Sequence, residues 1–163
     1  GSIPGGATRR AARRSPAAAT GGGETALYRK QRLVPSAEYR PLADGPGAFS
    51  TGGEAVVFNV AGAHFGPSIC LDIIYAGLVR ASVRAGADVL LNLSNDSWLA
   101  AGRGGAATQQ LAQAVFRAVE NRRDVVRAAT TGISAVIGAD GVPRVVLAAM
   151  AVRATPLSAR GSA

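Results

Sequence analysis

The chain has 163 residues, enough for one domain that buries about 70% of its unfolded surface, and 48% of them are hydrophobic but only 5% aromatic. The single cysteine excludes an internal disulfide framework. The net charge of +8 would suit an anionic partner, but the arginine bias runs through an Ala/Gly-rich chain without aromatic stacking positions, so we expect no nucleic-acid partner.

The two ends of the chain differ in composition from its middle. Residues 1–23 consist mainly of Gly, Ala, Pro, Ser and Arg with no acidic residue and no apolar periodicity, which predicts a disordered leader. We expect the folded part at 24–152 and a tail at 153–163. Within the folded part, 25–28 is expected to be a short strand, and the Pro/Gly-rich segment 41–53 a surface loop.

The segment that follows predicts two strands and a helix. Residues 55–60 alternate and are rich in β-branched side chains, which is typical of a strand. A turn at 62–64 would lead into a partner strand at 65–70. The spacing of Leu and Val over 75–85, with arginines between them, predicts a surface helix.

The remaining elements complete an alternating order. Residues 88–93 form a near-continuous apolar run, as expected for a strand buried on both faces. The apolar spacing over 106–129 predicts a long helix with an arginine-rich outer face. Residues 133–137 and 142–147 are expected to form a hairpin, because Asp140-Gly141 is a strong turn signal. The resulting order of strands and helices predicts a layered α/β fold.

Cys70 is the candidate nucleophile. It ends the predicted strand at 65–70 and precedes the predicted helix. A strand that turns sharply into a helix holds its last side chain where a substrate can reach it. The alternative is that Cys70 is a small buried hydrophobe, which is the commoner role of an isolated cysteine.

Lys30 and Glu38 are the candidate charged partners. Lys30 is the only lysine among 18 basic residues, which favours a site that requires a compact ammonium rather than a planar guanidinium. Glu38 follows beyond Pro35 and is close enough in sequence to hold that ammonium, although both could be ordinary surface residues. His64 has no cysteine or carboxylate at ligand spacing, so we expect no metal site.

Several blocks of sequence follow one another in unbroken order from about residue 28 to residue 146. They are 28–42 around the lysine, 69–72 around the cysteine, 93–98, and 117–120 together with Arg127 and 131–138. These blocks and their order resemble the nitrilase (carbon-nitrogen hydrolase) superfamily, and its apolipoprotein N-acyltransferase branch in particular.

The resemblance implies an αββα sandwich, expected here to be incomplete at its N-terminal side, and a Cys-Glu-Lys triad that needs no cofactor. Cys70 would attack a phospholipid ester to form a thioester, and Lys30 would stabilise the oxyanion. Glu38 would orient Lys30. The acyl chain would then pass to the N-terminal amine of a lipoprotein. Asp72 stands where the branch has a glutamate and is a possible auxiliary residue.

The resemblance also implies a place in the bacterial inner membrane, with the domain facing the periplasm and held by segments that this chain does not contain. The longest apolar run, 145–152, is far shorter than the roughly 20 residues that cross a bilayer. The family's general-base glutamate precedes the lysine segment, but residues 1–23 contain no carboxylate. Two alternatives therefore stay open: a soluble amidase of the same superfamily, and a truncated or degenerate domain without the chemistry.

Overall fold

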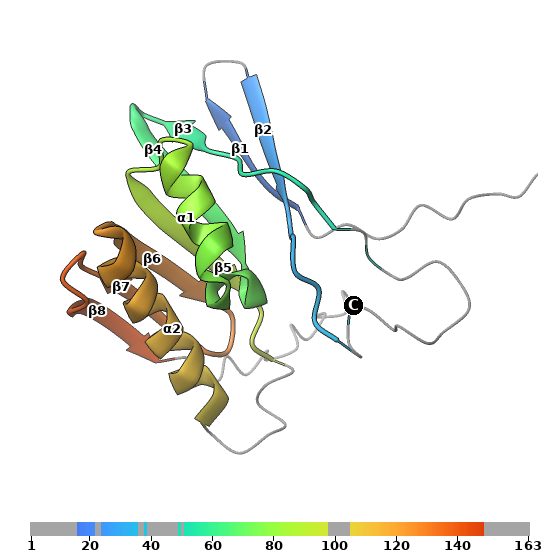
Figure 1. Ribbon diagram of the computed structural model, residues 1–163. Helices are drawn as coiled ribbons and strands as arrows, with labels where there is room; N and C mark the ends of the chain where they lie inside the picture. The colour runs from blue at the N-terminus through green and yellow to red at the C-terminus, as the bar shows by residue number, and fades with distance from the viewer. Residues whose placement is uncertain are drawn as a thin grey trace, which may run out of the picture.

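The computed structural model describes residues 16–21, 24–35, 38, 49, 51–97 and 105–148 (Figure 1). The strands form a two-stranded sheet and a six-stranded mixed sheet, which confirms the predicted α/β class. In chain order the elements are β1 Pro16–Gly21, β2 Glu24–Arg29, β3 Phe58–Val60, β4 Ala63–Ile69, the 3-10 helix η1 Cys70–Ile74, α1 Ala76–Arg84, β5 Val89–Ser94, α2 Gly105–Asn121, β6 Asp124–Ala129, β7 Ile133–Ile137 and β8 Pro143–Ala148.

The six-stranded sheet has the order β3-β4-β5-β6-β7-β8. Strands β4, β5 and β6 are parallel, whereas β3 on one side and β7 and β8 on the other pair antiparallel. Helix α1 connects β4 to β5 and α2 connects β5 to β6, because parallel neighbours need a crossover connection. The carboxyl ends of the three parallel strands therefore meet at one edge of the sheet.

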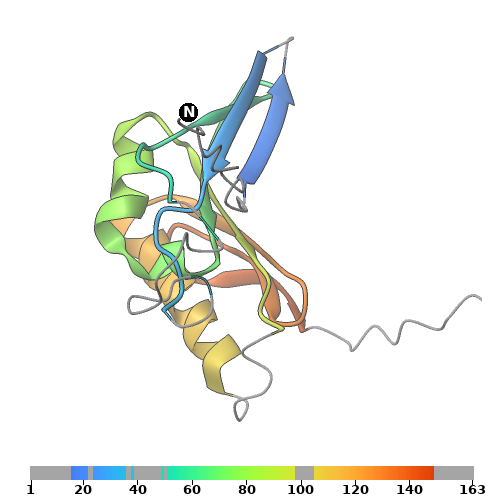
Figure 2. The same cartoon turned by 90° about the vertical axis from the view of Figure 1, so that its right-hand side faces the viewer.

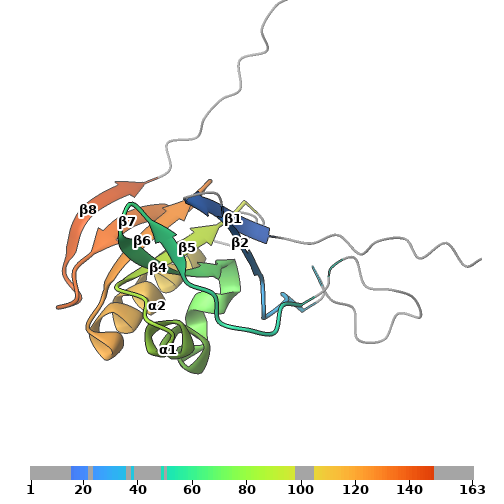
Figure 3. The same ribbon diagram turned by 90° about the horizontal axis from the view of Figure 1, so that it is seen from above.

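Helices α1 and α2 cover one face of this sheet (Figure 3). The core between helices and sheet contains Leu90, Val125 and Ile137 from the strands, and Ala114 and Ala118 from α2, all of them buried. The alanines allow α2 to lie close to the strands, and the branched strand residues fill the space between them. This core fixes the position of the strands whose ends carry the polar residues described below.

The β1–β2 hairpin lies on the opposite side of the sheet from the helices (Figures 2 and 3). Its contact with the sheet is a second apolar cluster, in which Tyr28 is 0% exposed and Phe58 is 3% exposed. Phe65, Ile69 and Leu93 pack against this pair. Strand β2, which leads into the lysine segment, is thereby held beside the end of β4, which leads into the cysteine.

Strand β1 lies inside the segment for which the sequence predicts a disordered leader. That prediction does not hold for Pro16–Gly21, which pair in register with Glu24–Arg29. The alanines and threonine of β1 give no apolar alternation, so composition hides a strand whose backbone groups are paired by its neighbour. The following predicted segments lie outside the described residues: 1–15, 22–23, most of 41–53, and 153–163.

The helix predicted at 106–129 is wrong beyond Asn121. Helix α2 ends there, and Arg122 adopts a left-handed conformation with φ 51°. The following residues form β6, in which Val125 is buried among the helix-facing core residues and Val126 points to the other face. The prediction failed because this pair of valines continues the apolar spacing of the helix.

The other predicted elements are present. The hairpin expected from Asp140-Gly141 is confirmed as β7 and β8, and Gly141 has the positive φ of 82° that such a turn requires. The strand predicted at 55–60 begins only at Phe58, and its turn lies at Ala61 and Gly62.

Candidate active site

The turn at Cys70 is the centre of the candidate site. Strand β4 ends at Ile69 and η1 begins at Cys70, which has a left-handed φ of 50°. A non-glycine residue in this region costs on the order of 1–3 kcal/mol and persists only where surrounding contacts hold it. Cys70 stands at the sharp strand-to-helix turn that the sequence predicts, but at 5% exposure it is buried, as in the alternative interpretation of an isolated cysteine.

Asp72 joins this turn to the lysine segment. Its side chain is fully buried and accepts a hydrogen bond from the Tyr28 hydroxyl at 2.8 Å. The carboxylate also accepts from the backbone N–H of Arg32 at 2.8 Å and from that of Ile69 at 3.1 Å. Asp72 therefore bonds residues on both sides of Lys30 and the residue before Cys70.

The Tyr28 hydroxyl is fixed as a donor in this arrangement. Burial raises the pKa of the Tyr28 phenol above its usual range, and the negative charge of Asp72 beside it raises the pKa further. The phenol therefore stays protonated, and its proton is directed at the Asp72 carboxylate.

Lys30 and Glu38 form the ion pair expected from the sequence. The Lys30 ammonium nitrogen lies 2.5 Å from Glu38 Oε2, and the side chains are 2% and 21% exposed. Glu38 is held in turn by the Val34 backbone N–H, which donates to the same oxygen at 2.8 Å. A buried ammonium needs such a partner, because an unpaired charge away from water costs several kcal/mol.

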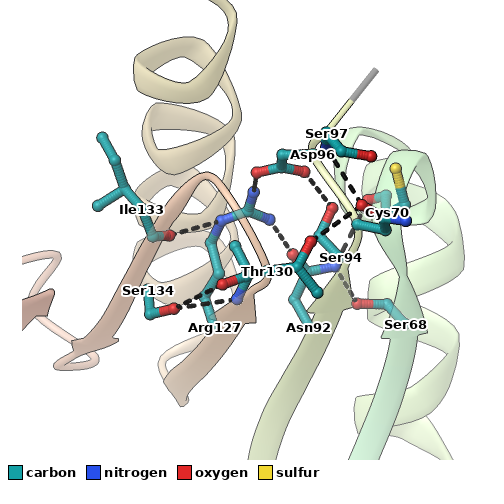
Figure 4. Close-up of polar contacts among 12 residues, drawn as sticks. Ser68, Cys70, Asn92, Ser94, Asp96, Ser97, Arg127, Thr130, Ile133 and Ser134 are labelled. Carbon is teal, nitrogen blue, oxygen red and sulfur yellow. Dashed lines mark hydrogen bonds and ion pairs between the residues drawn. The ribbon is translucent and has the colours of Figure 1, made fainter. Parts of the chain in front are cut away.

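A second group of buried polar residues lies at the ends of the parallel strands and contacts the Cys70 turn (Figure 4). Ser68, Asn92 and Arg127 occupy neighbouring register positions on β4, β5 and β6. Asn92 Nδ2 donates to Ser68 Oγ at 3.1 Å and to the Cys70 carbonyl at 3.4 Å. We call Ser68, Asn92, Asp96 and Arg127 the strand-end network.

Arg127 is the centre of the strand-end network. Its guanidinium donates to Asn92 Oδ1, to Asp96 Oδ2 at 2.6 Å and to the Ile133 carbonyl at 3.2 Å. The Arg127 side chain is 0% exposed and that of Asp96 1%. Ser94 Oγ donates to the other carboxylate oxygen of Asp96. In Figure 4 the guanidinium lies between Ile133 on one side and Asn92 and Asp96 on the other.

The structure thus brings Lys30 and Glu38 into contact, and links both to the Cys70 turn through Asp72. Sequence reasoning did not single out Asn92, and it placed Arg127 on the outer face of a helix. A positional signal exists for Asn92, because polar residues lie near the ends of the strands predicted at 65–70 and 88–93. Arg127 has no such signal as long as its segment is predicted to be a helix.

The described residues offer no arrangement for a metal ion. Among them, no group of three or more His, Cys, Asp and Glu side chains could hold one. His64 instead faces Asp88, with Nδ1 2.9 Å from the carboxylate, and both side chains are exposed. In the same part of the chain, no helix is long and apolar enough to cross a membrane.

Sequence comparison identifies relatives of this chain. The carbon-nitrogen hydrolase family model matches residues 17–149. The apolipoprotein N-acyltransferase of Geobacter metallireducens is 40% identical over 122 residues, which cover 69% of this chain and 23% of the relative. Apolipoprotein N-acyltransferase 1 of Treponema pallidum is 39% identical, covering 70% and 23%. The chain thus spans about a quarter of the length of these relatives.

Solved structures agree with the fold. A mutant of the amidase from Nesterenkonia sp. AN1, with the acetamide moiety of fluoroacetamide added covalently at its active-site cysteine, is 25% identical with a TM-score of 0.58, covering 77% of this chain and 47% of that one. Saccharomyces cerevisiae Nit3, of the nitrilase superfamily, is 21% identical with a TM-score of 0.58, covering 77% and 45%. The nitrilase-like fold implied by the sequence blocks is confirmed, and the chain belongs to the carbon-nitrogen hydrolase family.

Proposed function

We propose that this chain bears the nucleophile and the oxyanion-binding lysine of an apolipoprotein N-acyltransferase. One observation carries the proposal: a buried Lys30–Glu38 ion pair is joined through Asp72 to the strained turn that holds Cys70. Relatives of that name, about 40% identical over this region, support the same reading.

In the first half-reaction, the Cys70 thiolate attacks the ester carbonyl carbon of a phospholipid. A carbon–sulfur bond forms and the carbonyl oxygen becomes an oxyanion, which the Lys30 ammonium stabilises. The intermediate collapses by breaking the carbon–oxygen bond of the ester. The proton released by the thiol returns to the departing oxygen, so that the products are an acyl thioester on Cys70 and a lysophospholipid.

In the second half-reaction, the free amine of an N-terminal lipidated cysteine on a lipoprotein attacks the thioester carbonyl. The new amide bond forms as the carbon–sulfur bond breaks, and the amine proton returns to the cysteine sulfur. Glu38 keeps the Lys30 ammonium directed at the oxyanion in both steps. Lys30 is suited to this role because its point charge and rotatable donors can follow a developing oxyanion.

The proton transfers require a general base, a role that we assign to none of the residues described above. The proposed acyl donor is a phospholipid and the proposed acceptor a lipoprotein. Both belong to the bacterial inner membrane, where we propose that the domain faces the periplasm.

The test is mass spectrometry of the purified chain after incubation with phosphatidylethanolamine vesicles in an alkaline buffer, in which hydroxide can take the thiol proton in place of a general base. We expect one acyl adduct on Cys70 that hydroxylamine removes, as a thioester requires. Lys30→Gln should abolish the adduct, whereas Arg123→Gln, which removes a cation between α2 and β6 that bonds to the Ala87 carbonyl, should leave it unchanged. No adduct on a Cys70 that still reacts with iodoacetamide would refute the proposal.

An amidase is the second candidate, because a structural neighbour at 25% identity is an amidase with a reactive active-site cysteine. The same Cys70, Lys30 and Glu38 would act on a small amide and release ammonia. Ammonia release from small amides in the absence of lipid, lost in Cys70→Ser, would favour this function over acyl transfer from phospholipid.

A further inference from the structure

We propose that Asn92 and Arg127 are positioning residues for Cys70. Arg127 orients the amide of Asn92, and the oriented amide holds the Cys70 carbonyl and so maintains the left-handed turn that presents the thiol. This inference rests on the proposed function, because it concerns how the nucleophile of that reaction is held.

The orientation of the Asn92 amide follows from its partners. A guanidinium can only donate hydrogen bonds, so the bond from Arg127 Nη1 requires that the Asn92 oxygen face β6. The amide nitrogen must then face β4, where it donates to Ser68 Oγ and to the Cys70 carbonyl. Arg127 therefore decides which end of the amide reaches the cysteine.

Arg127 itself has little freedom to move. Its three nitrogens donate to Asn92, Asp96 and the Ile133 carbonyl, and its side chain is 0% exposed. Gly132 lies against the Asp96 carboxylate, so closely that an added Cβ would overlap it. A side chain at position 132 would displace the partner that holds Arg127.

The Cys70 turn is thereby held on both sides. Asp72 accepts from the N–H of Ile69, before the cysteine, and Asn92 donates to the carbonyl of Cys70 itself. With φ at 50°, Cys70 would relax to a negative φ if the carbonyl lost its donor. The thiol would then leave the direction in which the turn presents it.

The proposed effect is geometric rather than electrostatic. The charge of Arg127 is balanced by Asp96 at 2.6 Å, so it leaves little net field at the thiol. Loss of the Asn92 donor should therefore reduce the rate of acylation by changing φ at Cys70. A reduced rate with an unchanged φ would indicate an electrostatic role and overturn the proposal.

The decisive variant is Asn92→Asp, which keeps an oxygen for Arg127 but replaces the donor to Cys70 with a second acceptor. Asn95→Asp is the matched control, because Asn95 directly follows the same strand but, among the described residues, accepts hydrogen bonds from the Thr130 hydroxyl and the N–H of Ser97 and none from the Cys70 turn. In the isotope-labelled chain, the nuclear Overhauser effect between the amide and α protons of Cys70 reports the sign of its φ, because the two protons are closer together at φ 50° than at any negative φ. We expect a positive φ in the wild type and the control, and a negative φ in Asn92→Asp.

The same variants should also differ in Cys70 acylation. We expect Asn92→Asp to lower the rate of Cys70 acylation by at least tenfold. Arg127→Lys keeps the charge but cannot bond Asn92, Asp96 and Ile133 together, so it should give a smaller loss in the same direction. A folded Asn92→Asp chain with positive φ at Cys70 would overturn the proposal, as would unfolding of both variants, which would show a purely structural role.

Failure of the proposed function gives a different result. A wild-type chain that forms no acyl adduct refutes acyl transfer, but the sign of φ at Cys70 still decides whether Asn92 and Arg127 hold the turn. A wild-type adduct with an unchanged φ in both variants refutes the positioning role alone.

Discussion

Asp72→Asn should strongly destabilise the fold, although it changes only one atom of the side chain. The Asp72 carboxylate accepts from Tyr28 and Arg32 at 2.8 Å, and from Ile69 at 3.1 Å. An asparagine has one acceptor oxygen and one donor nitrogen, so it cannot satisfy donors on both sides. The less costly orientation places the nitrogen towards Tyr28, whose hydroxyl can rotate to accept.

The magnitude follows from what remains unpaired in that orientation. The backbone N–H of Ile69 faces a donor and loses its partner, which costs about 1–3 kcal/mol for a buried group. The bond from the Arg32 N–H to a neutral oxygen is weaker than to a carboxylate, by about 1 kcal/mol. Asn at this position should therefore lower the free energy of unfolding by about 2–4 kcal/mol.

Urea unfolding followed by circular dichroism measures this loss, provided that the slope of the transition stays constant. Asp88→Asn is the control, because the Asp88 side chain is exposed and its partner among the described residues is the exposed His64, so the change in stability should be less than about 0.5 kcal/mol. A loss below about 1 kcal/mol for Asp72→Asn would refute the idea that Asp72 ties the lysine segment to the cysteine turn.

Three further changes have definite expected results. Gly132→Ala should destabilise the chain by about 3 kcal/mol in urea unfolding, because the new Cβ displaces Asp96 from Arg127, whereas Gly53→Ala meets no atom within 4 Å and should be nearly neutral. Folding raises the pKa of Tyr28 above its usual 10.0, so the stability that the protonated phenol contributes is fully present below that pH and is lost as the pH rises further. Tyr28→Phe should therefore reduce the loss of stability at alkaline pH, measured by thermal unfolding. Leu90→Ala should cost about 2–5 kcal/mol by urea unfolding, since Leu90 is 2% exposed in the core under the helices, and a smaller loss would mean that the helices collapse into the cavity.

Much of the sheet could be predicted because its strands have local signals. The hairpin of β7 and β8 follows from Asp140-Gly141, and the buried strand β5 from its apolar run. Strand β6 was missed because Val125 and Val126 fit a helical spacing as well as a strand buried on both faces. Only the left-handed Arg122, which ends α2, separates the two possibilities, and a positive φ at arginine has no sequence signal.

The candidate site could be predicted in part. Cys70, Lys30 and Glu38 stand out because each is rare or suitably spaced in the sequence, although their catalytic roles stay predictions. The bonds that Asp72 makes could not be foreseen, since they join residues about 40 positions apart and depend on how the β1–β2 hairpin packs. Arg127 was hidden by the wrong helix, which placed it towards solvent.

Two neighbouring rows of residues cross the helix-covered face of the sheet, and they differ in polarity. One row, Leu90, Val125 and Ile137, is in register across three strands, and all of it is apolar and buried. The second row lies two residues further along the parallel strands and contains Asn92 and Arg127, which are buried as well but polar. An apolar row would serve stability at least as well, because buried ion pairs are often neutral or destabilising relative to packed hydrophobic residues. The polar row lies at the carboxyl ends of parallel strands, where open α/β sheets place their ligand sites, and it contacts the Cys70 turn. The cost of burying it is therefore best explained by the geometry of the cysteine and not by the stability of the core.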